Sequence, residues 1–407
     1  MSEWKEYKLA ELGTVVTGKT PSKNNPEDWG NEMPFVTPSD YKNYGKFAKS
    51  AERNLSLVGI ERLKSKILPS KSILVTCIGS DMGKVVMNVK PVISNQQINS
   101  IVVNSNVDCD FLYYRLVSMY DTLRIYGGDG TAVPIVNKRD FENIETEIPP
   151  LPEQTTIASI LSSLDDKIDL LHRQNTTLEK MAETLFRQWF VEEAKEEWEE
   201  GTLYDSIELV GGGTPKTSVD SYWNGTIKWL SGGDIAANHK SIIINSEKKI
   251  SEEGLNASSA KLLPKFSTVI SARGTVGKYC ILSEPMAFSQ SNYGIKPKFK
   301  NCYFFTYLLV NHCVEELNSA AYGSVFDTIT TNTFKGINLK LPMEDVIHEF
   351  ESLISNYFLK ILTNQTQIRT LTNLRNTLLP KLMSGEVRVK LPDTASKPKN
   401  KKQTQPG

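Results

Sequence analysis

The chain has 407 residues, of which 39% are hydrophobic and 23% charged, values typical of globular domains and not of a disordered chain. Its 47 basic and 47 acidic residues leave no net charge, so charge alone does not indicate a nucleic-acid partner. The apolar runs are too short and too polar to cross a bilayer, and the five cysteines show no CxxC spacing, which favours a reduced cytoplasmic protein without a zinc site.

Residues 1–150 are predicted to form an α+β domain. Short runs of β-forming residues, Ser72–Ile78 and Ser100–Val103, alternate with glycine-rich turns, and Asp110–Tyr120 has a helical pattern. Such a mixture of strands, turns and short helices is typical of an α+β domain, and 150 residues suffice to bury a core.

Residues 151–196 are predicted to form a long coiled-coil helix that begins at the prolines of Ile148–Glu153. Apolar residues recur with alternating spacings of four and three, interrupted only by Asn175, at Ile157, Leu161, Leu164, Ile168, Leu171, Leu178, Ala182, Leu185 and Trp189. The stretch 151–200 carries 12 acidic and 5 basic residues. This concentration of acid leaves the other surfaces free to approach phosphates despite the zero net charge.

Residues 197–342 repeat the first domain. Residues 3–40 recur at 197–234 with a constant shift of 194 positions, and the similarity continues downstream with small insertions and deletions. This period suits a duplicated domain and is far too long for a solenoid repeat. The repeated tryptophans Trp29, Trp223 and Trp229 are expected to be core anchors more than stacking platforms.

Residues 343–389 are predicted to form a second long helix, with seam residues Ile347, Phe350, Ile354, Tyr357, Ile361, Ile368, Leu371, Leu378 and Leu382 and polar interruptions at Asn364 and Arg375. Pro380 is expected to end or kink this helix early. Short connections favour antiparallel pairing of the two helices, with the domains at opposite ends. About 35–38 residues give a rod of roughly 50–57 Å, or about 15–17 base pairs. The tail 390–407 is expected to be disordered.

Two seam asparagines predict the register of the helix pair. If Asn175 faces Asn364, the internal pseudo-two-fold places Leu171 opposite Ile368. A buried polar pair is a known way to fix register. The alternative is that each asparagine is solvated at the edge of the seam.

Paired loops supply candidates for DNA contact. The loop Gly79–Lys84 corresponds to Arg273–Lys278, and the polar turn Ser94–Gln97 corresponds to Ser289–Asn292. Lysines suit phosphates, arginine suits a guanine edge or a phosphate, and amides and hydroxyls suit base edges. The candidates are Lys19, Thr20, Lys84, Asn95, Gln96, Gln97, Thr131, Lys216, Arg273, Lys278, Gln290, Asn292 and Ser324. For each of them the alternative is a solvated turn or a contact that shapes the fold.

Catalytic motifs are weak in this sequence. The loop Gly79–Lys84 is too short for a Walker loop, and the four histidines are scattered without metal or triad spacing. Asp234, Glu247 and Lys249 resemble a nuclease set, although the first repeat has Arg53 and Leu55 in place of the last two. A stand-alone magnesium-dependent nuclease and a coiled-coil adaptor between proteins are therefore kept as alternatives.

The layout resembles the specificity subunit of Type I restriction-modification enzymes. The resemblance rests on the Gly-x-Thr-Pro turns at Gly18–Pro21 and Gly212–Pro215, on Ile148–Gln154 before the first helix, and on Leu378–Glu386 at the end of the second. It covers residues 1–389 and implies two homologous α+β target-recognition domains joined by two antiparallel coiled-coil helices. Each domain would read half of a bipartite site in double-stranded DNA.

The resemblance also implies the division of labour in the complex. The helices would set the gap between the half-sites and dock two modification (methyltransferase) subunits, and restriction (translocase) subunits would complete the nuclease. The chain would bind no cofactor or metal itself, because S-adenosylmethionine, ATP and Mg²⁺ would be held by the partners.

Overall fold

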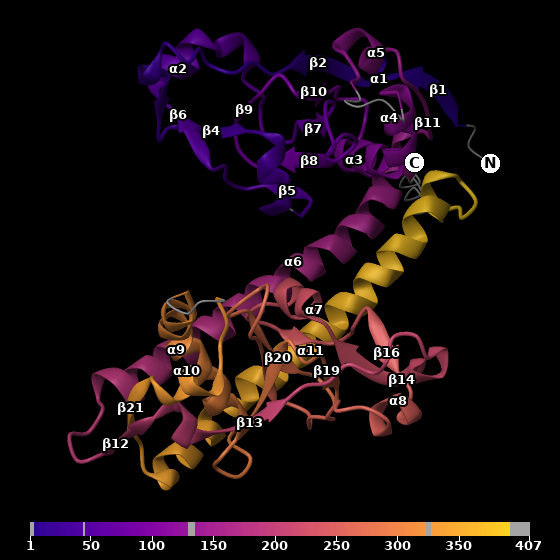
Figure 1. Ribbon diagram of the computed structural model, residues 1–407. Coiled ribbons are helices and arrows are strands. Elements are labelled where there is room, and N and C mark those ends of the chain that lie inside the picture. The colour runs from indigo at the N-terminus through magenta and orange to yellow at the C-terminus, as the bar shows by residue number, and fades with distance from the viewer. Residues whose placement is uncertain (1–3, 44, 129–134, 323–326, 391–407) are drawn as a thin grey trace, which may run out of the picture. The chain divides into compact units, whose positions relative to one another are not determined.

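The computed structural model describes residues 4–43, 45–128, 135–322 and 327–390. The chain divides into two compact units, one made of residues 1–169 and 370–407 and the other of residues 170–369 (Figure 1). Each unit contains one of the predicted domains together with a part of both long helices.

The first unit contains three sheets. A two-stranded sheet pairs β1 with β11, a five-stranded sheet has the order β2-β10-β7-β8-β5, and a four-stranded sheet has the order β3-β6-β4-β9. Their bounds are β1 Lys5–Lys8, β2 Gly13–Thr17, β3 Trp29–Gly30, β4 Met33–Val36, β5 Phe47–Ala48, β6 Arg53–Leu55, β7 Ile73–Thr76, β8 Val85–Asn88, β9 Ile93–Ser94, β10 Ile98–Val103 and β11 Glu145–Ile148. The run predicted at Ser72–Ile78 is the central strand β7, and all four of its residues are buried.

The first unit has five short helices, of which α3 packs against the five-stranded sheet and α2 lies beside β6 of the four-stranded sheet. They are α1 Leu9–Leu12, α2 Leu57–Arg62, α3 Cys109–Ser118, α4 Tyr120–Tyr126 and α5 Lys138–Glu142. The carboxylate of Asp108 caps α3 by accepting a hydrogen bond of 3.0 Å from the backbone N–H of Phe111. Phe111 and Leu116 of α3 are fully buried and share a core with Ile73 and Val75 of β7. Burial of this apolar helix face against the sheet stabilises the domain.

The second unit repeats this topology. Its five-stranded sheet has the order β13-β20-β17-β18-β15, which corresponds strand for strand to that of the first unit, and β12 pairs with β21 as β1 does with β11. A three-stranded sheet has the order β16-β14-β19. The bounds are β12 Glu199–Thr202, β13 Ile207–Gly211, β14 Trp223–Leu230, β15 Ile242–Ile243, β16 Lys248–Ile250, β17 Thr268–Ser271, β18 Tyr279–Leu282, β19 Ala287–Phe288, β20 Asn292–Pro297, β21 Asn338–Leu341, α7 Gly232–Ala237, α8 Glu252–Asn256, α9 Tyr303–Tyr322 and α10 Thr331–Lys335. The predicted pair of homologous α+β domains is confirmed.

Two long helices, α6 (Leu151–Arg187) and α11 (Glu344–Met383), pack together in both units. In the first unit Arg375 of α11 donates a hydrogen bond of 2.7 Å to Asp165 of α6, and in the second unit Asn364 donates one of 2.8 Å to Asn175. Between these two contacts the residue number rises from 165 to 175 on α6 and falls from 375 to 364 on α11. The two helices therefore run antiparallel, as predicted.

The seam positions predicted from the heptad spacing are buried or half-buried throughout both helices. They share the domain cores, since Ile157 and Leu161 belong to the core of the first unit, and Ile347 and Phe350 to that of the second. The heptad pattern thus describes both the contact between the helices and the contact of each helix with a domain.

The helix ends differ in detail from the sequence prediction. Helix α6 gives way to a π-helical segment at Gln188–Glu192, and α11 continues past Pro380 to Met383. The proline was expected to end or kink the helix early. It lies in the last turn, where its missing N–H removes a single intrahelical hydrogen bond, and Ser384 N–H still bonds to the Pro380 carbonyl at 2.9 Å.

Candidate nucleic-acid interface

In the first unit, the turn at Gly18 lies directly against the polar turn at 94–97. The N–H groups of Gly18 and Lys19 donate to the carbonyls of Ile98 and Ser94 at 3.1 and 2.9 Å. A Cβ atom on Gly18 would lie 2.1 Å from the carbonyl oxygen of Asn95, so only glycine allows this approach. Two segments that are far apart in the sequence therefore form one surface.

Cys77, just beyond β7, connects this surface to two further loops. Its N–H donates to the Gln97 carbonyl at 2.8 Å, and its carbonyl accepts from Val136 N–H at 2.9 Å. Cys77 is followed by the loop Gly79–Lys84, and Val136 follows the segment 129–134. We call this main-chain arrangement the loop frame. It consists of the glycine turn at Gly18, the polar turn at 94–97 and Cys77, joined by these hydrogen bonds.

The second unit contains the same loop frame. Gly213 N–H donates to the Phe288 carbonyl at 3.0 Å, Ala272 N–H to the Ser291 carbonyl at 3.0 Å, and Ile329 N–H to the Ala272 carbonyl at 3.1 Å. A Cβ atom on Gly212 would lie 2.2 Å from the carbonyl oxygen of Ser289. The duplication seen in the sequence therefore extends to the hydrogen bonds that hold the candidate loops.

Three candidates on the loop frame of the first unit are exposed, namely Lys19, Thr20 and Gln96. The Thr20 hydroxyl donates to the Gln96 side-chain carbonyl at 2.6 Å. Asn95 is buried and donates to the side-chain carbonyl of half-buried Gln97 at 2.9 Å. Its own side-chain carbonyl accepts from Gln97 N–H at 3.1 Å. Asn95 therefore shapes the turn that presents Gln96 and Gln97.

The candidate cations differ between the two copies. Lys84 is exposed, but its ammonium lies 2.7 Å from the Asp81 carboxylate. Arg273 and Lys278 are exposed, and within the described ranges neither the guanidinium nor the ammonium group forms an ion pair or hydrogen bond. Both loops turn through glycines in the left-handed region, Gly79 and Gly83 in the first and Gly274 and Gly277 in the second. The same backbone turn therefore carries a neutralised cation in one copy and two unpaired cations in the other.

The remaining candidates fall into three groups. Lys216 and Gln290 are exposed. Asn292 is only 2% exposed, and its amide donates to the Ser289 hydroxyl at 2.8 Å. Thr131 and Ser324 lie outside the described residues.

Two cation–aromatic pairs were missed by the sequence analysis. The Arg53 guanidinium lies 3.2 Å from the ring centre of Trp29, and the Lys248 ammonium lies 5.8 Å from that of Trp223. Trp29 and Trp223 are half-buried, whereas Trp229 is buried and donates to the Gly213 carbonyl at 2.9 Å. The pairs correspond between the copies because Phe35 faces Arg53 as Trp229 faces Lys248. Lys248 lies 195 positions after Arg53, one more than the constant shift of 194, because of a one-residue insertion. The match between the two cations is therefore not visible from the constant spacing.

The acidic residue of the nuclease alternative has a structural role. The Asp234 carboxylate accepts from the Ser231 N–H and hydroxyl at 2.9 and 2.6 Å, and from Glu247 N–H at 2.9 Å. Asp40 accepts the corresponding three bonds in the first unit. Among the residues that the structure describes, no group of His, Cys, Asp and Glu side chains could hold a metal ion. Asp234 is thus part of the duplicated fold, and three of the roughly four acceptor sites of its carboxylate are occupied by local hydrogen bonds.

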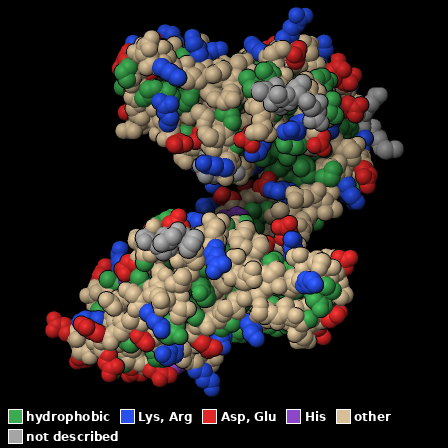
Figure 2. All heavy atoms as spheres, viewed as in Figure 1, with side chains coloured by type: hydrophobic (Ala, Val, Ile, Leu, Met, Phe, Trp, Pro, Cys, Tyr) green, Lys and Arg blue, Asp and Glu red, His purple; other side chains and the backbone are tan. Residues whose placement is uncertain are grey.

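Lysine and arginine side chains do not form a single basic patch on the face shown in Figure 2, where they alternate with acidic side chains over both units. This arrangement suits positioning against individual phosphates or bases better than it suits nonspecific attraction over a large area.

The chain belongs to a known protein family. The family described as "Type I restriction modification DNA specificity domain" matches residues 1–180 and 195–377. The chain is therefore a Type I restriction-modification specificity subunit that recognises a DNA target, as the sequence resemblance implied.

Individual relatives cover almost the whole chain. It is 27% identical to the MjaIX specificity subunit of Methanocaldococcus jannaschii over 95% of this chain and 94% of that protein. It is 22% identical to the HindI specificity subunit of Haemophilus influenzae over 95% of this chain and all of that protein. The crystal structure of the S subunit from M. genitalium shares the fold with a TM-score of 0.64 at 16% identity, covering 94% of this chain and 96% of that one.

Membership in this family defines the role of the chain in its complex. It is the specificity component of a Type I restriction enzyme and is not itself catalytic; S-adenosylmethionine, ATP and Mg²⁺ belong to partner subunits. In the described part of the chain, no helix is both long and apolar enough to span a membrane.

Proposed function

We propose that each of the two domains reads one half of a bipartite, asymmetric DNA site. The observation that carries this proposal is the loop frame, in which three main-chain hydrogen bonds recur at corresponding positions of both units while the exposed side chains differ. Two readers with one backbone and two sets of side chains suit two related but different half-sites. In this proposal residues 1–150 and 197–342 are the target-recognition domains, and residues 151–196 and 343–389 are the spacers, with the tail 390–407 outside both.

The exposed side chains of the loop frames and half-buried Gln97 are the proposed DNA contacts, and Thr131 and Ser324, outside the described residues, are proposed from the sequence. Amides and hydroxyls read base edges and cations bind phosphates or guanine, whereas the buried Asn95 and Asn292 hold the turns in shape. The proposed contacts are Lys19, Thr20, Lys84, Gln96, Gln97 and Thr131 in the first domain and Lys216, Arg273, Lys278, Gln290 and Ser324 in the second.

The antiparallel helices are the proposed determinant of the gap between the half-sites. Helices of 37 and 40 residues are about 55 and 60 Å long at ~1.5 Å per residue. The Asn175–Asn364 pair supports a fixed register, because the buried Asn364 amide group reaches the Asn175 side-chain oxygen only when the two asparagines face each other. A register slip would leave both amides unpaired in the seam.

The partners follow from the same proposal. Two modification (methyltransferase) subunits dock on the helices, and restriction (translocase) subunits join them in the complete enzyme. A cytoplasmic location agrees with five cysteines that are all free thiols.

The test is to map methylated adenines in a genome that encodes this chain and its partner subunits. The expected result is one bipartite motif with a constant gap, and inserting the same heptad into α6 and α11 widens the gap while both half-sites stay unchanged. A continuous motif, or a gap that ignores the insertion, would contradict the proposal. A gel shift with the mapped duplex separates DNA reading from a pure adaptor role, since an adaptor would give no shift that depends on either half-site.

A further inference from the structure

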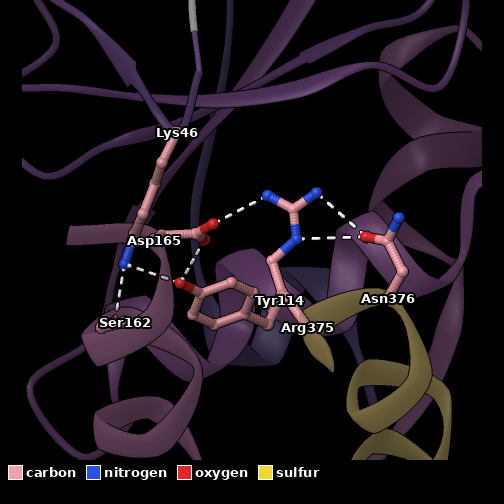
Figure 3. A network of polar contacts seen from close by, with 6 residues as sticks. All are labelled: Lys46, Tyr114, Ser162, Asp165, Arg375 and Asn376. Atoms are coloured by element: carbon pink, nitrogen blue, oxygen red, sulfur yellow. Dashed lines mark hydrogen bonds and ion pairs between the residues drawn. The ribbon is translucent and has the colours of Figure 1, made fainter. Parts of the chain in front are cut away.

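A chain of polar contacts joins the first domain to both long helices within the first unit (Figure 3). The Tyr114 hydroxyl donates to one oxygen of Asp165 at 2.6 Å, and Arg375 donates to the other oxygen at 2.7 Å. The Lys46 ammonium donates to the Ser162 hydroxyl at 2.8 Å and lies 3.5 Å from the Tyr114 oxygen. We call these residues the polar network.

The polar network links four separate segments of the chain. Lys46 immediately precedes β5, Tyr114 lies on α3, Asp165 on α6 and Arg375 on α11. Lys46 also forms an ion pair with Asp110, so the network holds two cations and two carboxylates and is neutral as a whole. A single acid, Asp165, therefore receives one bond from the recognition domain and one from the opposite helix.

The centre of the polar network is removed from water and its edges are half-buried. The side chains of Lys46 and Asp165 are 4% and 11% exposed, whereas those of Asp110 and Arg375 are 30% and 31% exposed. Burial raises the pKa of the Tyr114 phenol, with the Asp165 charge as the next cause, so the hydroxyl remains a donor. Buried ion pairs add little net stability, because the desolvation cost offsets the attraction, but they are satisfied only in one geometry. Their main effect here is on orientation.

The second unit is attached to the helices by different chemistry. Tyr307 corresponds to Tyr114 in the repeat, and its ring packs edge-on against Phe358 of α11 at 5.6 Å. Ser241 takes the place of Lys46, because the following strands pair alike, and its hydroxyl accepts from Gln365 at 2.6 Å. Charged groups also attach this domain, since the Glu351 carboxylate of α11 accepts from the N–H groups of Phe304 and Phe305 at 3.1 and 2.7 Å, and Glu183 of α6 accepts from Asn311 at 2.9 Å. Neither of these two acids is bonded to the domain and to the opposite long helix at once, as Asp165 is in the first unit.

We propose that the polar network is a positioning device which fixes the angle of the first recognition domain on its own segment of the helix pair, so that the enzyme rejects DNA sites whose gap is one base pair too long or too short. The proposal rests on the proposed bipartite reading. Because Asp165 is bonded to the domain and to α11 at once, a rotation of the domain on the helices breaks at least one bond to a buried charge. The network therefore sets how strictly the gap is read, while the loops set which bases are read.

The test compares folded variants of the full chain, assembled with its modification subunits, on three duplexes that carry the mapped half-sites at the native gap and at one base pair more or less. The measured quantity is the ratio of methylation rates between the native and the altered gaps. Tyr114→Phe removes one hydroxyl, and the pair Asp165→Leu with Arg375→Leu removes the central ion pair without leaving a lone buried charge. We expect this ratio to fall about threefold for the first and about tenfold for the second, with half-site preference unchanged.

The matched control is Tyr307→Phe, which removes the equivalent hydroxyl from the second unit and is expected to leave the ratio unchanged. A native ratio in both first-unit variants, or an equal fall in the control, overturns the positioning role. If the double leucine variant does not fold, as judged by its thermal melting, the Tyr114→Phe ratio decides alone. If the unmodified complex methylates all three duplexes equally, the bipartite reading itself has failed, which is a different outcome from an unchanged ratio in the variants.

Discussion

The unequal charge of the two candidate loops predicts unequal effects on the salt dependence of DNA binding. Arg273 and Lys278 have no partner among the described residues, whereas Lys84 is neutralised by Asp81 at 2.7 Å. The perturbation is to replace these cations by alanine, separately in each loop, and to replace Asp81 by asparagine. The prediction is that the second loop supplies more of the electrostatic affinity than the first.

The magnitude follows from counterion release. Each phosphate contact contributes about 0.9 to the slope of log K against log salt concentration. Over a fourfold rise in salt, each contact therefore accounts for a loss of affinity of about 3.5-fold, and two contacts for a loss of about 12-fold. A variant that lacks the contacts does not show that part of the loss. Arg273→Ala with Lys278→Ala should therefore flatten the slope by up to about 1.8. Lys84→Ala should change it by well under 0.9, because Asp81 remains near the DNA, and Asp81→Asn should steepen it by up to about 0.9 by freeing Lys84.

The assay is equilibrium binding of the assembled complex to the mapped duplex at several salt concentrations, with fluorescence anisotropy as the signal. Lys340→Ala serves as the control, since this exposed lysine belongs to the separate sheet formed by β12 and β21. Equal slope changes for Lys84→Ala and Lys278→Ala would refute the reasoning from the Asp81 ion pair. No change for Arg273 and Lys278 together would remove both from the phosphate contacts.

Three further perturbations test the turn, the helix seam and a buried acid. Gly212→Ala places a Cβ atom 2.2 Å from the polar turn and should weaken recognition of the second half-site alone, whereas Gly211→Ala, whose Cβ meets nothing within 4 Å, should bind normally in the same gel shift. Asn364→Leu strands the Asn175 amide in the seam and should cost about 1–3 kcal/mol of unfolding free energy, whereas replacing both asparagines by leucine should restore or raise the melting temperature; a single variant as stable as the native chain would contradict this. Burial, together with the neighbouring Glu183 carboxylate, raises the pKa of Glu179 to about 7 in the folded chain, above its unfolded value. Because the folded chain then holds this proton more tightly than the unfolded chain, the free energy of unfolding falls as the pH rises from roughly 4.5 to 7. Glu179→Gln should flatten that loss in urea unfolding at pH 5 and pH 8, and an unchanged difference would show that this acid is not responsible.

The sequence contained enough information to predict features that depend on period or repetition. The heptad spacing predicted both long helices and the residues that they bury, because apolar residues repeated every 3.5 positions form one continuous face only on an α-helix. The constant shift of 194 positions identified two domains of one fold, and the strand orders agree with it. Pro380 was misjudged because its effect depends on how many turns follow it, which the sequence pattern did not specify.

Features that depend on the chain folding back on itself were not predictable in the same way. Lys46 and Arg375 have no sequence relation, and only the packing of α3 between the helices and the strand β5 brings them to one carboxylate cluster. The Asp81–Lys84 pair, in contrast, spans three residues and could have been found from the sequence as a local ion pair. Its neglect led to Lys84 and Lys278 being treated as equivalent phosphate contacts.

The loop frame explains how the two copies could diverge without loss of the fold. The hydrogen bonds that define this frame join main-chain groups, the buried side chains of Asn95 and Asn292 support the turns, and the close approach at Gly18 and Gly212 depends on the absence of a side chain. Exchange of the exposed side chains on these loops therefore breaks no bond of the frame and leaves no buried group unpaired. Arg273 and its counterpart Ile78 illustrate this freedom, since a cation and an apolar residue occupy the same place on the same turn. A reader built in this way can change the bases that it recognises through a few surface substitutions while the strands, the helices and their packing stay as they are.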